Sequence, residues 1–424
     1  MYKKVVVLLA IATTTFAVAA CSEKLDAGKS CPLLCPEQAI SLVDTTIDAV
    51  FGDTTVLGLP PIGSETYLML ASHGDTVETR AIVRFDTLQQ SFTAANNTDS
   101  TITKLDSAVL VLPIAKPDSV HRPSSPITIE VYDVDTTATD TVASILGSLF
   151  RPDRFLGSKT FAPESLLDTL RVPISPDSVL ARIDSGTHLR VGLRLVAPAT
   201  QGYDLRIGTT NGGNSASLHL RPSSDTAVKP LNITPVSRTP PNEPFISGPL
   251  ADYTIVLVGQ TTTPATELSV GGIPSRRSLL RFNIPSRIID STTVVRASLL
   301  LTQTPNRRVD PLDSVYVFPL AILATPAVTD PGTLLRFVSS AGLVGLDSLR
   351  MAPADSGVRS FEIVGLVRTW RNQPQTVSPR ALGLLSGAEA QLPAEIDFFS
   401  TQAPAEVRPR LRITYVPQTS YGVP

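Results

Sequence analysis

The chain contains the same series of short apolar runs twice. Ala81–Asp86 and Leu279–Asn283 share the residues Arg-Phe followed by Asp or Asn, and further runs match in the same order. Arg84 and Arg281 are 197 positions apart, and Leu218 and Leu411 are 193 apart. The remaining pairs are Ser107–Leu112 with Ala297–Thr302, Val179–Ile183 with Leu366–Trp370, Leu189–Leu195 with Arg380–Leu385, Tyr203–Ile207 with Glu395–Phe399, and Ala216–Leu220 with Pro409–Tyr415. A duplicated domain explains this spacing.

Most of these runs are typical of β-strands. They are short, rich in Val, Leu and Ile, and bounded by turn-forming residues, and the chain holds 36 Pro and 25 Gly, which disfavour long helices. In Leu189–Leu195 the apolar residues alternate with Arg190, Gly192 and Arg194, as expected where one face of a sheet is buried. We predict an all-β protein of two tandem jelly-roll-like antiparallel β-sandwiches, with short helices at 142–150 and 363–370.

A proline-rich segment separates the two copies. Its prolines, at 230, 235, 240, 241 and 244, favour an extended linker. The sequence therefore predicts a first sandwich at 44–222, a linker at 223–248 and a second sandwich at 249–418.

The N-terminus has the features of an export signal. Lys3 and Lys4 precede the apolar run Val5–Ala12, which is too short to span a membrane, and Val18-Ala-Ala-Cys21 is similar to a bacterial lipobox. We predict a signal peptide at 1–20, Cys21 as the lipid anchor, and a tether at 21–43 that holds the protein on a membrane. Ser22 after the cysteine favours the outer membrane of a bacterial cell envelope.

Cys31 and Cys35 lie in the tether. An exported pair can oxidise, and a disulfide across Cys-Pro-Leu-Leu-Cys would stiffen the tether while adding little global stability, because the loop is small. Free thiols and a zinc site are the alternatives. Zinc would need further ligands, and the neighbouring sequence supplies no His or third Cys.

Several segments of the second copy resemble the DNRLRE-domain family. They are Arg276–Phe282, Ala297–Leu301, Phe361–Trp370 followed by Gly383-Leu-Leu, Phe399–Pro404 and Arg408–Tyr415. The resemblance implies jelly-roll β-sandwiches of bacterial surface proteins, whose relatives include alginate-binding carbohydrate modules. The tryptophan-containing segment common in the middle of the family's domain is absent from both copies. Carbohydrate binding is therefore an expectation without assigned residues.

No catalytic or phosphate-binding motif occurs in the chain. The sequence lacks Gly-x-Ser-x-Gly, His-Glu-x-x-His, Walker-type and dinucleotide fingerprints, and its four histidines are scattered. We predict a non-enzyme without cofactor or bound metal. Asp133, Asp135 and Asp140 are better explained as turn residues than as a calcium loop, which would also need a central Gly and a closing Glu. A formal net charge of -2 argues against nucleic acid as a partner.

Arginine supplies the candidate binding residues. The strand alternation that buries leucine turns arginines outward on both copies, and guanidinium groups bind carboxylates in a bidentate manner. The candidates for a ligand face are Arg190, Arg194, Arg206, Arg410 and Arg412. A solvated arginine face is the alternative. Aromatic residues are only 5% of the chain and Trp370 is expected in the core, which disfavours stacking of neutral sugars.

These observations predict a lipid-anchored, non-catalytic envelope protein that serves adhesion, scaffolding or assembly, with another envelope protein as one kind of partner. The alternative is a binding module for an acidic polysaccharide such as alginate.

Overall fold

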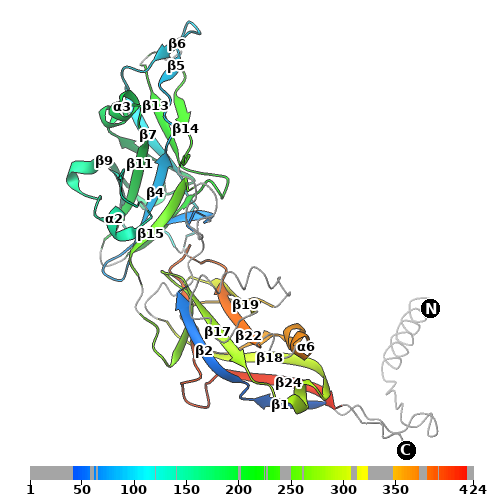
Figure 1. Ribbon diagram of the computed structural model, residues 1–424. Coiled ribbons are helices and arrows are strands. Elements are labelled where there is room, and N and C mark those ends of the chain that lie inside the picture. The colour runs from blue at the N-terminus through cyan, green and yellow to red at the C-terminus, as the bar shows by residue number, and fades with distance from the viewer. Residues whose placement is uncertain are drawn as a thin grey trace, which may run out of the picture.

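The computed structural model contains two β-sandwiches arranged end to end (Figure 1). It describes residues 42–57, 62–63, 65–119, 121–139, 141–198, 202–223, 225, 228–238, 250–259, 262–306, 313–322, 347–371, 380–389 and 391–417. Antiparallel strands dominate both bodies, and helices are few and short. The predicted all-β class and the two sandwiches are confirmed.

The first sandwich, the upper body in Figure 1, consists of β3 to β15. One sheet has the order β12-β3-β4-β11-β8-β9, with β15 also paired to β4, and the facing sheet has the order β10-β7-β13-β14. The strands are β3 (Tyr67–His73), β4 (Val77–Phe85), β7 (Ser107–Pro113), β8 (Ile127–Asp133), β9 (Phe155–Phe161), β10 (Thr169–Ile174), β11 (Leu189–Val196), β12 (Tyr203–Gly208), β13 (Ser217–Arg221), β14 (Leu231–Ile233) and β15 (Asp252–Val258). A hairpin of β5 (Ser91–Thr93) and β6 (Asp99–Thr101) lies at the tip, and α2 (Ala143–Gly147), η1 (Pro152–Arg154), η2 (Pro163–Ser165) and α3 (Pro176–Asp184) connect strands.

The second sandwich has the same plan. Its sheets join into one path, β1-β24-β18-β23-β16-β17-β22-β19-β20, with β2 paired to β17 and β21 paired to β18. The strands are β1 (Val43–Ile47), β2 (Val50–Leu57), β16 (Glu267–Gly271), β17 (Arg276–Phe282), β18 (Thr292–Thr304), β19 (Val315–Ile322), β20 (Leu349–Met351), β21 (Gly357–Glu362), β22 (Ala381–Ser386), β23 (Glu395–Phe399) and β24 (Arg410–Pro417). Helices α4 (Ser286–Ile289) and α6 (Val364–Arg371) pack against β18.

The two sandwiches exchange strands. Pair by pair, β4 with β11, β12 with β3, and β7 with β13 correspond to β17 with β22, β23 with β16, and β18 with β24. By the same correspondence β1 and β2, from the start of the chain, occupy in the second sandwich the places that β14 and β15 occupy in the first. Each copy of the repeat thus gives its first two strands to the other copy's sandwich.

Matching side chains fix the exchanged strands in both bodies. Asp53 on β2 accepts hydrogen bonds from the backbone N–H and the hydroxyl of Thr401, at 2.6 and 2.9 Å. Asp252 on β15 makes the same two contacts with Thr210, at 2.8 and 2.9 Å. These equivalent contacts hold each exchanged strand to the sandwich that it joins, because charge-assisted hydrogen bonds are stronger than neutral ones.

The exchange moves the sandwich boundaries away from the ranges expected from the sequence. Residues 44–57, expected in the first sandwich, pair with the second, as does Val43, expected in the tether, and β15, expected in the second, pairs with the first. The expected linker at 223–248 contributes β14, an edge strand that fits between Pro230 and Pro235. The sequence repeat shows which segments of the two copies are equivalent. It does not show in which of the two sandwiches a given strand pairs.

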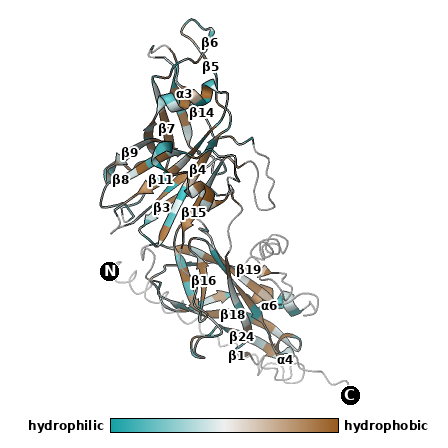
Figure 2. Ribbon diagram, turned by 60° about the vertical axis from the view of Figure 1, so that its left-hand side comes forward, coloured by the Kyte–Doolittle hydropathy of each residue, from teal (hydrophilic) through white to brown (hydrophobic). Residues whose placement is uncertain are grey.

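Each sandwich encloses its own hydrophobic core. Leu189, Val191 and Leu193 are buried in the first core, as their alternation predicts, and the strands show alternating apolar and polar colours in Figure 2. Trp370 is 3% exposed and its ring centroid lies 5.1 Å from that of Phe282, so its expected core position is confirmed. The two expected helices are found as α2 and α6, and Val179–Ile183 lies in the helix α3 that corresponds to α6.

Glu65 is a buried carboxyl group where the chain enters the first sandwich from the second. It is 7% exposed, and among the described residues its Oε2 has no hydrogen-bond partner. Burial, together with the Asp252 carboxylate nearby, raises the pKa of Glu65 to about 7. Because this carboxyl binds its proton more tightly in the folded state, the free energy of unfolding of the protein falls as the pH rises through this range.

The exchange predicts which fragments fold. Residues 62–259 contain all the strands of the first sandwich, so we expect cooperative thermal unfolding of this fragment by circular dichroism. Residues 262–418 lack β1 and β2, which leaves an edge of β17 unpaired and removes the buried Ala49 and Val50 from the core. We expect this fragment to fold only when a peptide of residues 42–57 is added. Folding of 262–418 alone would contradict the observed pairing.

Glu65→Gln should change how stability depends on pH. Between about pH 4.5 and 7 the folded protein binds more protons than the unfolded chain at this site, so the free energy of unfolding falls as pH rises. The variant avoids this loss, and we expect it to be more stable than the wild type at pH 8 by on the order of 2–3 kcal/mol, with little difference at pH 4.5. Urea denaturation at both pH values measures this, with the exposed Glu164→Gln as the control. Equal stability at pH 8 would refute the assignment.

Candidate functional site

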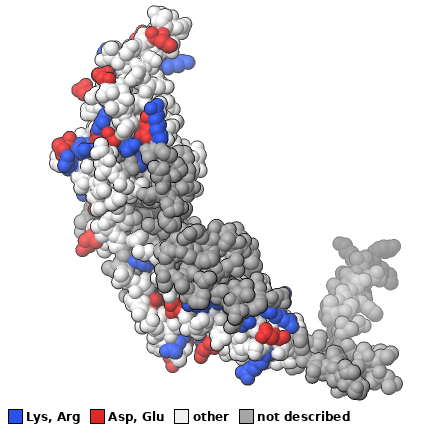
Figure 3. Space-filling model, viewed as in Figure 1, with Lys and Arg blue, Asp and Glu red and all other residues white. Residues whose placement is uncertain are grey.

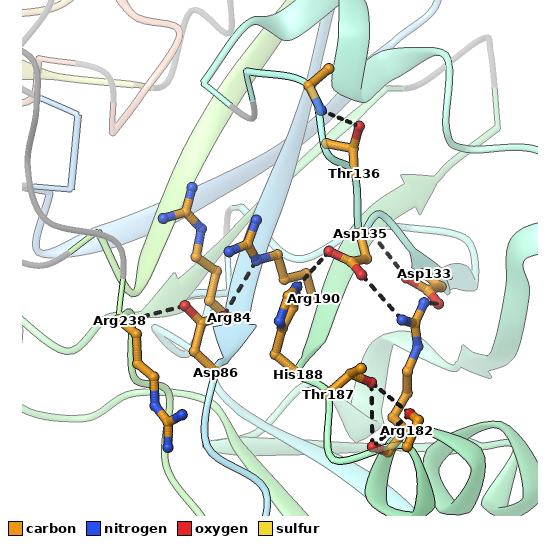
Figure 4. Close-up of polar contacts among 12 residues, drawn as sticks. Arg84, Asp86, Asp133, Asp135, Thr136, Arg182, Thr187, His188, Arg190 and Arg238 are labelled. Atoms are coloured by element: carbon orange, nitrogen blue, oxygen red, sulfur yellow. Dashed lines mark hydrogen bonds and ion pairs between the residues drawn. The ribbon is translucent and has the colours of Figure 1, made fainter.

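Two of the predicted binding arginines, Arg190 and Arg194, lie on the same face of β11, with Gly192 between them. In the register of β11 with β4, Arg190 lies opposite Arg84 and Arg194 opposite Arg80. Like charges on opposing positions repel, so these pairs need carboxylates nearby. Asp86 accepts a hydrogen bond from Arg190 Nε at 3.3 Å, and it also accepts one from the backbone N–H of Arg238 (Figure 4).

Carboxylates offset the second pair in the same way. Arg80 donates to Glu78, with Nη2 at 2.7 Å from Oε1. Arg194 lies 3.6 Å from a carboxylate oxygen of Glu78 and 3.6 Å from one of Glu130. On this face of the first sandwich the arginines and the carboxylates therefore form a row of ion pairs.

The aspartates at the end of β8 also have basic partners. Arg182 on α3 forms ion pairs with Asp133 and Asp135, and the Nε2 atom of His188 lies 2.7 Å from Asp135 (Figure 4). Asp140, the third candidate for a calcium loop, lies outside the described residues. No cluster of three or more His, Cys, Asp or Glu suited to a metal ion occurs in the part of the chain that the structure describes.

The remaining predicted arginines lie apart from this row of ion pairs. Arg410 and Arg412 are on β24 of the second sandwich, where Arg412 forms an exposed bidentate ion pair with Asp44 on β1. Arg206 is on β12, an edge strand that β3 and β4 separate from β11. The structure thus does not bring the five arginines together, and on the face drawn in Figure 3 basic and acidic side chains are interspersed.

Arg206 lines a polar cleft where the two sandwiches meet. The cleft has a volume of about 400 Å³. From the first sandwich it is lined by His73, Ala115, Lys116, Pro117, Asp118, His121, Gly202, Tyr203, Asp204 and Arg206, and from the second by Asp313, Ser314, Arg350 and Leu392. Charged and polar side chains make up most of its lining.

The acidic groups of this cleft are held by histidines. His73 Nε2 lies 2.8 Å from Asp204, and His121 Nδ1 lies 2.8 Å from Asp118. His121 also reaches across the junction, where its Nε2 lies 3.5 Å from Asp313. His121 therefore links a loop of the first sandwich to the start of β19 in the second.

Tyr203, another lining residue of this cleft, also packs in the core of the first sandwich. Burial and the neighbouring Asp204 carboxylate raise the pKa of Tyr203 to about 12, so the phenol keeps its proton at all physiological pH values. It can both donate and accept a hydrogen bond.

The sequence pointed to one residue of this cleft, Arg206. His73 and His121 are far apart along the chain, and Arg350 belongs to the other sandwich, so no local motif connects them. A signal was present for the neighbouring strand β19. In Val315-Tyr-Val-Phe318 the alternation places Tyr316 and Phe318 together on the face opposite the buried valines.

Several predictions concern segments outside the described residues. They are the signal peptide at 1–20, the lipid anchor Cys21, most of the tether, and Cys31 with Cys35. Within the described ranges, no helix is both long enough and apolar enough to cross a membrane.

Comparisons with known proteins add one weak similarity. No protein-family model and no curated protein sequence matches the chain. Among solved structures, the chain is similar to the tandem CBM51 modules of Sp3GH98, the family 98 glycoside hydrolase from Streptococcus pneumoniae SP3-BS71. The identity is 8%, the match covers 87% of this chain and 100% of the other, and the TM-score is 0.11. A TM-score this low does not establish a common fold, and the resemblance to the DNRLRE-domain family stays a prediction from the sequence.

Proposed function

We propose that this chain is a lipid-anchored, non-catalytic protein of the bacterial cell envelope that serves adhesion or scaffolding by holding the first sandwich away from the membrane. The observation that carries the proposal is the exchange of strands. Because β1 and β2 belong to the second sandwich and β15 to the first, the backbone crosses the junction twice, and each crossing is fixed at both ends by a β-ladder. Such a joint resists separation of the two bodies better than a single flexible linker does.

The position of β1 determines the direction in which a pulling force would run through the second sandwich. β1 lies at the end of the second sandwich that is farthest from the first, and β2 runs from there toward the junction (Figure 1). A tether that ends at Val43 would transmit force along these strands. A pull from the first sandwich would then load the ladders of β1 with β24 and β2 with β17 along their length, so that many hydrogen bonds resist together.

The sequence of the N-terminus supports the anchor. Acyl chains on Cys21 would hold the tether at the membrane, since each buried CH₂ contributes about 0.8 kcal/mol and two or three chains give stable binding.

The proposed load path can be tested by single-molecule force spectroscopy. Pulling between the N-terminal segment and Asn96, in the turn between β5 and β6, should require a clearly higher force than pulling between the N-terminal segment and the C-terminus. In the second geometry Val43 and its partner Tyr415 are pulled apart at one end, which opens β1 from β24 one pair at a time. Equal forces in the two geometries would contradict a load-bearing design.

Cys21→Ser tests the anchor. We expect the variant to lose incorporation of a labelled fatty acid and to leave the membrane fraction, because the serine hydroxyl does not accept the lipid. Cys31→Ser is the matched control, and it should keep both label and membrane association. Retention of the Cys21→Ser protein on membranes stripped with high salt would exclude the proposed anchoring.

A further inference from the structure

Aspartate is followed by a hydroxyl-bearing residue throughout this chain. Of its 38 acidic residues 26 are Asp, and 17 of these precede Ser or Thr, whereas only 3 of the 12 Glu do. Asn precedes Ser or Thr in 2 of 9 cases. In 15 of the 17 Asp cases the third residue is Ala, Val, Leu or Thr. We call this tripeptide, Asp, then Ser or Thr, then Ala, Val, Leu or Thr, the Asp-hydroxyl motif.

Turn formation explains only part of this pattern. Asp favours turns because its side chain accepts a hydrogen bond from a backbone N–H a few residues further on, and Asn does the same. Among the motif aspartates that the structure describes, Asp118 accepts such a bond from the N–H of His121, at 2.9 Å, whereas Asp168, Asp177 and Asp290 accept none. The turn alone therefore does not account for the choice of Asp, or for the hydroxyl that follows it.

The motif places hydroxyl groups on the surface at the start of strands. Thr169 is the first residue of β10, Ser107 is the first of β7, and Ser291 directly precedes β18. The residue that follows the hydroxyl belongs to the core, since Leu170 is 1% exposed and Ala108 is 2% exposed. Thr169 and Ser291 are exposed, and neither hydroxyl has a hydrogen-bond partner among the described residues. These hydroxyls are accessible and have no structural task.

Several motifs lie on the outermost strands of the sheets. Thr45 is on β1, Thr169 is on β10 and Ser348 immediately precedes β20. In the part of the chain that the structure describes, each of these strands pairs with a single neighbour. Such edges present unpaired N–H and C=O groups that can pair with another chain, and proteins commonly protect them. A bulky group on the motif hydroxyl would block this pairing.

We propose that the hydroxyls of the Asp-hydroxyl motif are sites of O-glycosylation. In each transfer the Oγ atom attacks the anomeric carbon of a glycosyl diphosphate, the bond from that carbon to the diphosphate breaks, and the hydroxyl proton passes to a base of the transferase. The transferase recognises the carboxylate, the hydroxyl and the side chain that follows. Because that third side chain becomes buried, as Leu170 does, the motif is recognised on the exported chain before it folds.

A sugar fits these positions better than a phosphate does. A phosphate adds up to about two negative charges, and the Asp carboxylate beside each hydroxyl would repel it. A neutral glycan adds bulk and solubility without charge. Segments rich in Ser, Thr and Pro are also typical of O-glycosylated stalks, and this chain holds 36 Pro. The inference rests on the proposed envelope location, and it adds to the scaffold a sugar coat that keeps the sheet edges of neighbouring copies apart.

Peptide mass spectrometry of the full chain tests the modification. We expect peptides with Thr169 and Ser291, from protein purified from its natural host, to carry hexose, deoxyhexose or N-acetylhexosamine increments that alkaline β-elimination removes. The same sequence made by cell-free synthesis gives the unmodified masses. Ser360, an exposed serine preceded by Arg359, is the internal control and should carry no sugar. Bare peptides, phosphate in place of sugar, or equal modification of Ser360 would overturn the proposal.

Asp168→Asn tests the part that the carboxylate plays. The Asp168 side chain is exposed, and its backbone carbonyl, which accepts a hydrogen bond from the N–H of Ile114, is kept in the variant. We expect Thr169 to lose most of its sugar while Ser291 stays modified. Arg171→Gln changes an exposed charge two residues beyond Thr169 and should leave its modification as in the wild type. Undiminished modification of Thr169 in Asp168→Asn would refute recognition of the motif.

Membrane fractionation separates this inference from the proposed anchor. Bare motif peptides in protein that Cys21→Ser releases from the membrane would refute the glycosylation and leave the anchor intact. Sugar on a protein whose membrane association does not depend on Cys21 would support the glycosylation and refute the anchor.

Discussion

The backbone ladders of the exchanged strands are the interaction on which the rest of this protein depends. β2 pairs with β17 over most of its length, and β15 pairs with β4 in the same manner, so each sheet gains its full width only from a strand encoded about 170 to 230 residues away in the sequence. The clamps of Asp53 on Thr401 and of Asp252 on Thr210 hold both strands in one register. In each copy of the repeat the first two strands complete the other copy's sandwich, so neither copy forms a complete sandwich by itself.

The exchange also explains why a site can form between two domains of a duplicated protein. Ordinary tandem domains meet through a modest interface and move relative to each other. Here the two crossings of the backbone hold the bodies together, and the cleft draws Arg206 from one sandwich and Arg350 from the other. His121, close to Asp118 and Asp313, adds a polar link at the same place. Preorganisation of this kind lowers the entropic cost of binding a ligand across a junction.

The sequence supported the fold class well because strand signals are local. Alternation in Leu189–Leu195, the apolar matches between the two copies and the positions of α2 and α6 all depend on neighbouring residues, and the structure agrees with them. The exchange was not predictable in this way, since β1 would satisfy the pairing pattern of either sandwich. Only the tertiary arrangement, including which core receives Ala49 and Val50, decides between the two.

In the candidate site too, local features were predictable from the sequence and contacts between distant segments were not. Alternation placed Arg190 and Arg194 on the face of β11 opposite the buried leucines, but it could not show that Asp86 and Glu78 lie beside them, because these carboxylates come from β4 and the residue that follows it. Arg206 alternates outward on its strand as Arg190 and Arg194 do, and it differs from these two arginines in the side chains that lie around it. Charge balance at a surface depends on neighbours across strands and domains, and it therefore becomes visible only in three dimensions.

A pair of engineered disulfides tests the exchange most directly. In the structure Thr46 on β1 lies opposite Arg412 on β24, whereas in an arrangement without exchange it would lie opposite the equivalent residue of the first sandwich, His219. In a chain without its natural cysteines, Thr46→Cys with Arg412→Cys should form a disulfide within the monomer, as detected by mass spectrometry and non-reducing electrophoresis, because opposing residues of a ladder are within bonding reach. Thr46→Cys with His219→Cys should remain reduced. Formation of the second disulfide in place of the first would contradict the exchange of strands.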